Sequence, residues 1–413
     1  MACTKRFCML HINPCPEHEC PTFETDEKSV NEAANRALEA ELASIARRVQ
    51  LSALTERAAA LRGGIACSAP DLSMEALSGM NIHLTLRFDD GVDEAATLTF
   101  LSTKTSVPVP RVYDVSLPSQ PNDVGVGYIL MEKLEGTAMD WTELRLDAQA
   151  QTKVLEQFAD IFASLSQHAF PLIGCLQSCD PTVVGPLVSE NAADVIDGTT
   201  RCIGPFKSTA DYLTAVVDVA IDHILQRESQ VQDPVGPYLA LREVQNSVRL
   251  SLPEAVRRAP AEFFLRHMDD KGDQVLLDAA HNIVGIIDWE WAQTLPKEHA
   301  FAAPLFMVDV GSYYDGIDGL SDAEAQFADI LERKGHAGLA ECVRAGRASH
   351  RLAHAVDEGS APDDVKVHLR SFRRLVQKVD EEWETWEARA MSLKGLKHDR
   401  DPGLRKLLDW QKA

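Results

Sequence analysis

The sequence has no long apolar segment. Its apolar stretches, such as residues 300–310, are interrupted, here by Pro304 and Asp309, whereas a membrane-spanning helix needs about 20 predominantly apolar residues. A secretory signal would have an apolar run near the N-terminus, but Pro14 interrupts the chain there. These absences predict a cytoplasmic protein that has no membrane partner.

Basic residues are scarce compared with acidic ones. Lys and Arg number 41 and Asp and Glu number 63, so the formal net charge of the 413-residue chain is −22. Nucleic-acid backbones would repel such a chain, and we therefore expect no nucleic-acid partner. Nothing in the composition indicates an oligomeric state.

Paired cysteines are also missing. The chain has nine cysteines, and none forms the C-x-x-C pair of many zinc sites. Those in the body of the chain are scattered singly, which is typical of reduced intracellular cysteines. A group of cysteines and histidines near the N-terminus could offer zinc ligands, but its spacing makes an irregular tail, residues 1–28, the favoured interpretation. That group comprises Cys3, Cys8, His11, Cys15, His18 and Cys20.

The hydrophobic periodicity changes along the chain. Residues 29–136 combine helical patterns with strand patterns, for example the alternation between Leu77 and Asp90 and the apolar run 125–131. Residues 137–413 are mostly helical in pattern, with one embedded strand cluster. An amphipathic stripe runs from Val154 to Leu165, residues 171–186 read as a loop, and the chain after Trp291 reads as helical again. The length suggests two or three domains. We therefore expect an α+β fold with a small mixed lobe, a larger helical lobe and a boundary near residue 136.

The strand cluster carries the most informative residues. Residues 263–291 read FFLRHMDDKGDQVLLDAAHNIVGIIDWEW. An apolar strand runs into His267 and Asp269, a charged loop and a hairpin follow, and Asp288 ends the last strand. Two carboxylates that a hairpin brings together can hold a divalent cation and position a hydroxyl nucleophile.

This segment resembles the catalytic segment of the aminoglycoside phosphotransferase family, in its fungal-type branch. His267-x-Asp269 matches the opening of the family's catalytic loop, and Ile287-Asp288-Trp289 matches its closing motif. The resemblance implies a two-lobed protein-kinase-like fold with a reduced N-lobe sheet. It also implies that Asp269 orients or deprotonates a substrate hydroxyl, that His267 braces the loop, and that Asp288 binds Mg²⁺.

The resemblance extends over roughly residues 75–350. The segment 128–136 resembles the strand and hinge that pass the adenine, so main-chain groups of Met131, Glu132 and Lys133 would read the base. Segment 105–112 resembles the stretch after the helix of the smaller lobe. Loops near residues 170–174, 205–206 and 315–344 resemble those of the fungal branch.

Two features depart from the family pattern. Gln274 stands where the family has a metal-binding asparagine, and its carbonyl oxygen could still serve as a ligand, with Asp270 or Asp273 as substitutes. Glu94 resembles the acidic partner of a phosphate-contacting Lys or Arg, but the pattern leaves too few residues before Glu94 for the strand that carries this cation in the family. Arg87 and Lys104 are possible replacements for the cation.

The sequence therefore predicts an enzyme that transfers the γ-phosphoryl group of ATP, or of GTP, to a hydroxyl group of a small molecule with the help of Mg²⁺. The alternative is a catalytically weak or inactive pseudokinase-like binding protein of the same fold. A third interpretation is another Mg²⁺-dependent phosphoester enzyme, which would not need the hinge-like segment at Glu132.

Overall fold

The computed structural model describes most of the chain beyond residue 42. The described residues are 43–44, 47–61, 67–68, 77–78, 81–82, 87–88, 96–116, 121–179, 182–187, 203–226, 234–251, 262–356, 362–395 and 401–411. In these ranges, none of the helices has the length and apolar character needed to cross a membrane. The N-terminal Cys/His group and Glu94 lie outside the described residues.

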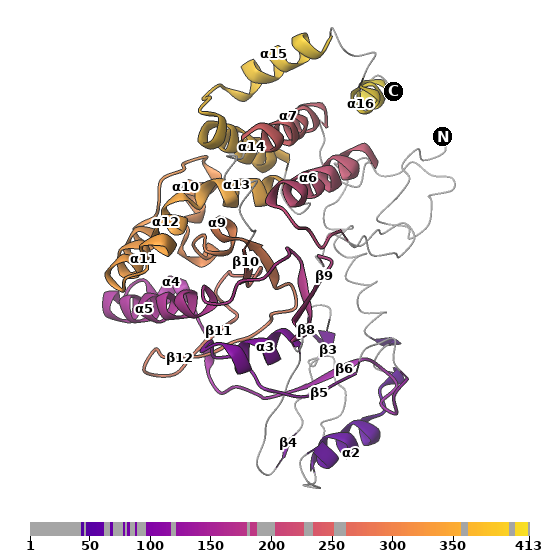
Figure 1. Ribbon diagram of the computed structural model, residues 1–413, viewed down its shortest axis with the longest axis vertical. Coiled ribbons are helices and arrows are strands. Elements are labelled where there is room, and N and C mark those ends of the chain that lie inside the picture. The colour runs from indigo at the N-terminus through magenta and orange to yellow at the C-terminus, as the bar shows by residue number, and fades with distance from the viewer. Residues whose placement is uncertain are drawn as a thin grey trace.

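Within the ranges just given, the N-terminal elements are helices and short antiparallel strand pairs (Figure 1). They are α2 (Leu51–Leu61), β1 (Cys67–Ser68), β2 (Leu77–Ser78), β3 (Asn81–Ile82), β4 (Arg87–Phe88), α3 (Ala96–Lys104), β5 (Val112–Ser116) and β6 (Tyr128–Met131). Strand β1 pairs with β4, β2 with β3 and β5 with β6. Helix α2 packs its buried Leu54 and Ala58 on Val124 and Leu130, which attaches it to the β5–β6 pair.

The remaining chain is mainly helical. Its strands are β7 (Thr137–Ala138), β8 (Cys175–Cys179), β9 (Thr182–Gly185), β10 (Phe263–Arg266), β11 (Val275–Leu277), β12 (Ile283–Ile286) and β13 (Gln293–Pro296). Its helices are α4 (Trp141–Leu144), α5 (Ala148–Leu165), α6 (Thr209–Gln226), α7 (Val235–Ser251), α9 (Lys297–Ala300), the 3-10 turn η3 (Leu305–Met307), α10 (Val310–Tyr314), α11 (Asp322–Arg333), α12 (Ala337–Ala345), α13 (Arg347–Val356), α14 (Pro362–Gln377), α15 (Trp383–Gly395) and α16 (Pro402–Gln411).

Helix α5 is central to the larger core. Asp147 caps its N-terminus by accepting hydrogen bonds from the Gln149 and Ala150 amides. Its apolar stripe, which the sequence predicts, is buried, and each fully buried side chain of this kind contributes about 1.5–3 kcal/mol. The stripe is Val154, Phe158, Ile161, Phe162 and Leu165. The same core includes α3, β10, the β11–β12 hairpin, α11 and α12.

A second core joins the helices α6, α7, α13, α14, α15 and α16, which lie together at one end of the molecule (Figure 1). Arg351, at the base of this region, is fully buried. It donates hydrogen bonds to Asp318, to the carbonyl oxygens of Tyr313 and Ile317, and to His368 Nδ1. Because Nδ1 accepts from a guanidinium, this imidazole is neutral in the folded protein.

The order of elements confirms the predicted α+β class, with a small mixed N-terminal part and a larger helical part. Two details of the predicted order are wrong. Residues 171–186, expected as a loop, contain the β8–β9 hairpin, and the chain after Trp291 is not wholly helical, because β13 pairs with β10. The proposed boundary at residue 136 stays a prediction.

Candidate active site

The segment 263–291 contributes its strands to the larger core and also contacts the chain that precedes that core. Strand β10 is buried because Phe263, Phe264 and Leu265 are all apolar, and it pairs with β13. The β11–β12 hairpin pairs with β7, directly after the hinge segment. The Ile286 amide donates to the Pro108 carbonyl oxygen at 2.8 Å. These contacts place the loop between β10 and β11 next to the chain that enters from the smaller lobe.

The β11–β12 turn is built by one carboxylate. Asp278 accepts hydrogen bonds from the backbone amides of Ala280 and Asn282 and from the Asn282 side chain. These bonds, above all the one from the Asn282 side chain, lower the pKa of Asp278. His281, inside the turn, has a φ of 58°. The turn fixes the register in which Val275 lies opposite Ile286.

His267 joins the loop to the segment that precedes Asp288. Its Nε2 donates to the Ile287 carbonyl oxygen at 2.8 Å, and its ring lies edge-on to Trp289 with 4.7 Å between the ring centroids. Trp289 is buried and donates to the Ile286 carbonyl oxygen. The imidazole thus contacts both the Ile287 carbonyl oxygen and Trp289, and its role as a brace stays a prediction.

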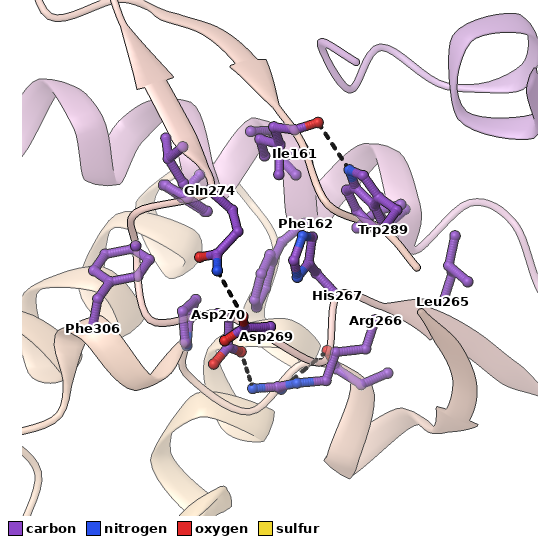
Figure 2. A pocket seen from close by; sticks show the side chains of 17 residues that line it. Ile161, Phe162, Leu265, Arg266, His267, Asp269, Asp270, Gln274, Trp289 and Phe306 are labelled. Carbon is purple, nitrogen blue, oxygen red and sulfur yellow. Dashed lines mark hydrogen bonds and ion pairs between the residues drawn. The ribbon is translucent and has the colours of Figure 1, made fainter. Parts of the chain in front are cut away.

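Asp269 is held by Gln274. The Gln274 Nε2 donates to Asp269 Oδ2 at 2.7 Å, and Figure 2 shows the amide nitrogen pointing to the carboxylate while the amide oxygen points away. Gln274 is only 7% exposed, and its Oε1 has no hydrogen-bond partner among the described residues. An acceptor that is buried without a partner is costly, so this oxygen is suited to a ligand that it would accept from or coordinate.

Asp288 is exposed and comes directly after Ile287, a residue that contacts Gln274. The amide of Ile287, the preceding residue, donates to the Gln274 carbonyl oxygen at 3.0 Å. Asp288 itself has a left-handed backbone with a φ of 66°. Strain of this kind in a non-glycine residue is concentrated at functional sites. The structure thus joins the loop of Asp269 and the turn of Asp288 through Gln274 and Ile287.

Lys271 interacts electrostatically with three carboxylates of the site. Its Nζ lies 3.2 Å from Asp269 Oδ1. Burial alone would lower the pKa of Lys271, but the hydrogen bond and charge of Asp269, with the charges of Asp273 and Asp288, outweigh burial and raise the pKa. The ammonium group therefore lies in a field to which three carboxylates contribute.

Asp270 faces the protein interior instead. It pairs with Arg266, and both side chains are about one-tenth exposed (Figure 2). Its Oδ1 accepts from the Leu305 amide at 3.0 Å, and its carbonyl oxygen accepts from the Phe306 amide. This carboxylate anchors the loop, so it is not free to substitute for Gln274 as a metal ligand.

A cavity of about 50 Å³ lies behind the loop, between α5, η3 and the β11–β12 hairpin. Its lining is mainly apolar, with Ile161, Phe162 and Phe306 among the lining residues (Figure 2). The cavity reaches the loop residues His267, Asp269 and Gln274, whereas Lys271 and Asp288 are exposed.

The predicted hinge residues lie on the chain that leads to β7. Met131 and Lys133 are exposed and Glu132 is half-buried. The Glu132 amide already donates to the Arg111 carbonyl oxygen at 3.3 Å. Of the cations considered as phosphate contacts, Lys104 is exposed at the end of α3, and the side chain of Arg87 lies outside the described residues.

The donor set can be compared with the needs of Mg²⁺. No group of three or more His, Cys, Asp or Glu side chains suited to a metal occurs in the described ranges. Mg²⁺, however, is usually held by one or two protein oxygens, with substrate phosphates and waters completing the coordination. The exposed carboxylate of Asp288 fits that mode of binding, while the amide oxygen of Gln274 is unpartnered among the described residues but buried in this structure.

Sequence patterns did not reveal the role of Arg266. Its guanidinium donates to the carbonyl oxygens of His299 and Ala302 in addition to Asp270. The only local signal was an arginine at the end of an apolar strand, four positions before an aspartate.

A family model matches this region. The model of the phosphotransferase enzyme family (APH) matches residues 85–296, which is just over half of the chain. Among curated proteins, a subtelomeric hrmA-associated cluster protein of Aspergillus fumigatus is 29% identical over 126 residues, 26% of this chain and 25% of that protein. The clavilactone A biosynthesis cluster protein Y of Ampulloclitocybe clavipes is 22% identical over 222 residues, 52% of either protein. This chain thus spans a quarter to a half of these relatives.

Solved structures give weaker similarity. The aminoglycoside phosphotransferase APH(4)-Ia is 15% identical, and the match covers 79% of this chain and 99% of that chain with a TM-score of 0.43. The ethanolamine kinase of Plasmodium vivax is 11% identical, with coverage of 75% and 72% and a TM-score of 0.35. The assignment therefore rests on the family model, and membership of a fungal-type branch stays a prediction. Because the matched residues include His267, Asp269 and Asp288, and more than half of the chain, this protein belongs to the phosphotransferase enzyme family.

Proposed function

We propose that this protein transfers the γ-phosphoryl group of ATP to a hydroxyl group of a small molecule, with Mg²⁺ as cofactor. The observation that carries the proposal is the set of hydrogen bonds that links Asp269 to Gln274, and Gln274 through Ile287 to the turn of Asp288. A base for the hydroxyl and a carboxylate for the cation are thereby held by one small unit, which suits phosphoryl transfer because that reaction depends mainly on positioning and charge.

Asp269 orients the acceptor hydroxyl and accepts its proton as the oxygen attacks phosphorus. Its Oδ2 is fixed by the Gln274 amide, which restrains the carboxylate in one orientation. His267 keeps the loop against the Ile287 carbonyl oxygen and takes no part in proton transfer. Asp288 and the Gln274 amide oxygen would hold Mg²⁺, which, when bound, supplies positive charge to the nucleotide phosphates.

The nucleotide base would contact the hinge segment. Main-chain groups of Met131, Glu132 and Lys133 are the proposed contacts, and the Glu132 amide would have to exchange its long bond to Arg111 or leave recognition to its neighbours. The role of Glu94 as the acidic partner of a phosphate-contacting cation stays a prediction. So does a cytoplasmic location without a nucleic-acid or membrane partner.

We do not favour the pseudokinase-like alternative. A binding protein without turnover has no need of an ordered Asp269, whereas here Gln274 uses a buried amide to hold this carboxylate. The substitution of Gln for Asn keeps both an amide donor and an oxygen acceptor at the position.

The experiment is ATP consumption with a panel of small alcohols and aminoglycosides, for the wild type and Asp269→Asn. Asparagine keeps an acceptor for the Gln274 amide, so the fold should persist while the base is lost. We expect turnover by the wild type and a loss of about 10²–10⁴-fold in the variant, the usual contribution of a general base. Equal turnover by the two proteins would exclude the mechanism.

A separate binding measurement does not depend on the acceptor. Mg·ATP should raise the unfolding temperature of the wild type, because a ligand that binds only the native state stabilises it by mass action. Absence of any shift at millimolar Mg·ATP would favour the pseudokinase-like alternative.

A further inference from the structure

The candidate site is acidic before any substrate binds. Asp269, Asp273 and Asp288 all act on Lys271 electrostatically, and Lys271 is the cation in contact with Asp269. These three carboxylates outnumber the one ammonium that they act on, so this part of the site carries net negative charge. A nucleotide triphosphate adds further negative charge, so its phosphates need positive partners to approach this loop.

The other cation of the loop cannot supply that charge. The Arg266 guanidinium is about one-tenth exposed and donates to Asp270 and to the carbonyl oxygens of His299 and Ala302. Lys271, by contrast, is 64% exposed and has its ammonium at the edge of the loop that carries Asp269. A flexible four-carbon stem lets such an ammonium exchange one oxygen partner for another.

We propose that Lys271 is a catalytic residue that binds the phosphoryl group as it passes from the nucleotide to the acceptor. This inference rests on the proposed function and adds a residue to it. In the free protein the ammonium is paired with Asp269. When substrates bind, it turns to the non-bridging oxygens of the γ-phosphoryl group, which frees an oxygen of Asp269 for the acceptor hydroxyl.

In the transfer step the acceptor oxygen forms a bond to the γ-phosphorus, and the bond from that phosphorus to the bridging oxygen of ADP breaks. The electron pair of the broken bond stays on the β-phosphate of ADP. The hydroxyl proton moves to Asp269 and later to solvent. Lys271 remains protonated throughout, because its role is to donate hydrogen bonds to the oxygens whose charge is redistributed.

The competing interpretation is an ordinary ion pair on a solvated turn. Exposed pairs of this kind contribute about 0–1 kcal/mol to stability and do not distinguish one nucleotide from another. The Lys334–Asp160 pair, with an Nζ–Oδ1 distance of 2.6 Å, joins the C-cap of α11 to α5 and is an exposed pair away from the loop. It provides a matched control.

The test uses the full chain with Lys271→Met, Lys271→Arg and the control Lys334→Met. Hydrolysis of Mg·ATP, with water as the acceptor, gives a rate that needs no identified substrate. Calorimetric titration with Mg·AMP-PNP and with Mg·ADP measures whether an effect depends on the γ-phosphoryl group, and urea unfolding measures stability.

We expect Lys271→Met to slow hydrolysis about 100-fold, which is typical for loss of one donor to a developing charge. It should weaken Mg·AMP-PNP binding about tenfold and leave Mg·ADP binding and the unfolding midpoint unchanged, while Lys271→Arg restores most of the Mg·AMP-PNP affinity. Equal weakening for the two nucleotides, or a Lys271→Met variant as active as Lys334→Met, would overturn the inference. If the wild type binds neither nucleotide, the proposed function fails instead.

Discussion

The anchoring role of Asp270 gives a prediction that can be worked out from the contacts. Asp270→Ala removes the carboxylate that neutralises Arg266 and the acceptor of the Leu305 amide. Both charged side chains are about one-tenth exposed, so water replaces the lost partner only in part. The variant leaves a cation and an amide donor without their oxygen partners.

The magnitude follows from the burial. Removing one partner of a buried ion pair costs about 3–5 kcal/mol, and a buried amide without an acceptor adds about 1–3 kcal/mol. The carbonyl oxygens of His299 and Ala302 still accept from Arg266 and offset part of the loss. We therefore expect a destabilisation of about 3–4 kcal/mol, which is a large share of the stability of an ordinary domain.

The assay is equilibrium unfolding in urea followed by tryptophan fluorescence, because Trp289 packs against the same loop. The control is Asp273→Ala, an exposed carboxylate three positions further on, which should change the free energy of unfolding by less than about 0.5 kcal/mol. If Asp270→Ala unfolds at the same urea concentration as Asp273→Ala, the contacts do not anchor the loop.

Three further predictions concern other residues. In thermal unfolding, Gly272→Ala should destabilise the protein by about 2 kcal/mol or more, and it should also lower activity. The reason is that Gly272 has a φ of 112° and a Cβ there would lie 3.0 Å from Met139 Cε. The control Gly319→Ala, where a Cβ meets nothing within 4 Å, should leave the unfolding temperature nearly unchanged. Burial, with the charges of His354 and Arg351, lowers the pKa of His368 to about 3. Since the imidazole of the unfolded state takes up a proton near pH 6.5, the free energy of unfolding should fall by about 1.4 kcal/mol per pH unit as the pH drops from 6.5 toward 3. If the urea midpoint of His368→Gln falls with pH as steeply as that of the wild type, this prediction is refuted. Gln274→Met, which lacks the amide donor to Asp269, should lower the initial rate of ATP consumption on the order of a hundredfold, and an unchanged rate would show that this hydrogen bond does not orient the base.

Local patterns were sufficient to predict several elements. The stripe on α5 and the apolar runs of β10, β11 and β12 are strong because most of their apolar residues lie in one core. The hairpin that brings the turn of Asp288 to Gln274 was predicted for the same reason. In these segments the sequence neighbours decide the structure, and periodicity reports it.

Elements that depend on distant partners were missed. The β8–β9 hairpin looked like a loop because of its glycines, yet a Cβ on Gly174 would lie 1.9 Å from the Gly185 carbonyl oxygen, so close strand passage requires glycine there. Thr294, on the unpredicted β13, exchanges hydrogen bonds with Gly174. The carbonyl oxygens that accept from Arg266, those of His299 and Ala302, likewise lie more than 30 positions away. No local pattern encodes such contacts.

The central claim, that the turn of Asp288 and the loop of Asp269 form one magnesium-dependent site, is tested most directly by calorimetric titration of AMP-PNP with and without Mg²⁺. Asp288→Asn is the suitable variant, because asparagine tolerates the left-handed backbone at this position while carrying no charge. We predict that Mg²⁺ tightens AMP-PNP binding about tenfold or more in the wild type and has little effect in the variant. An equal gain from Mg²⁺ in both proteins would contradict the account.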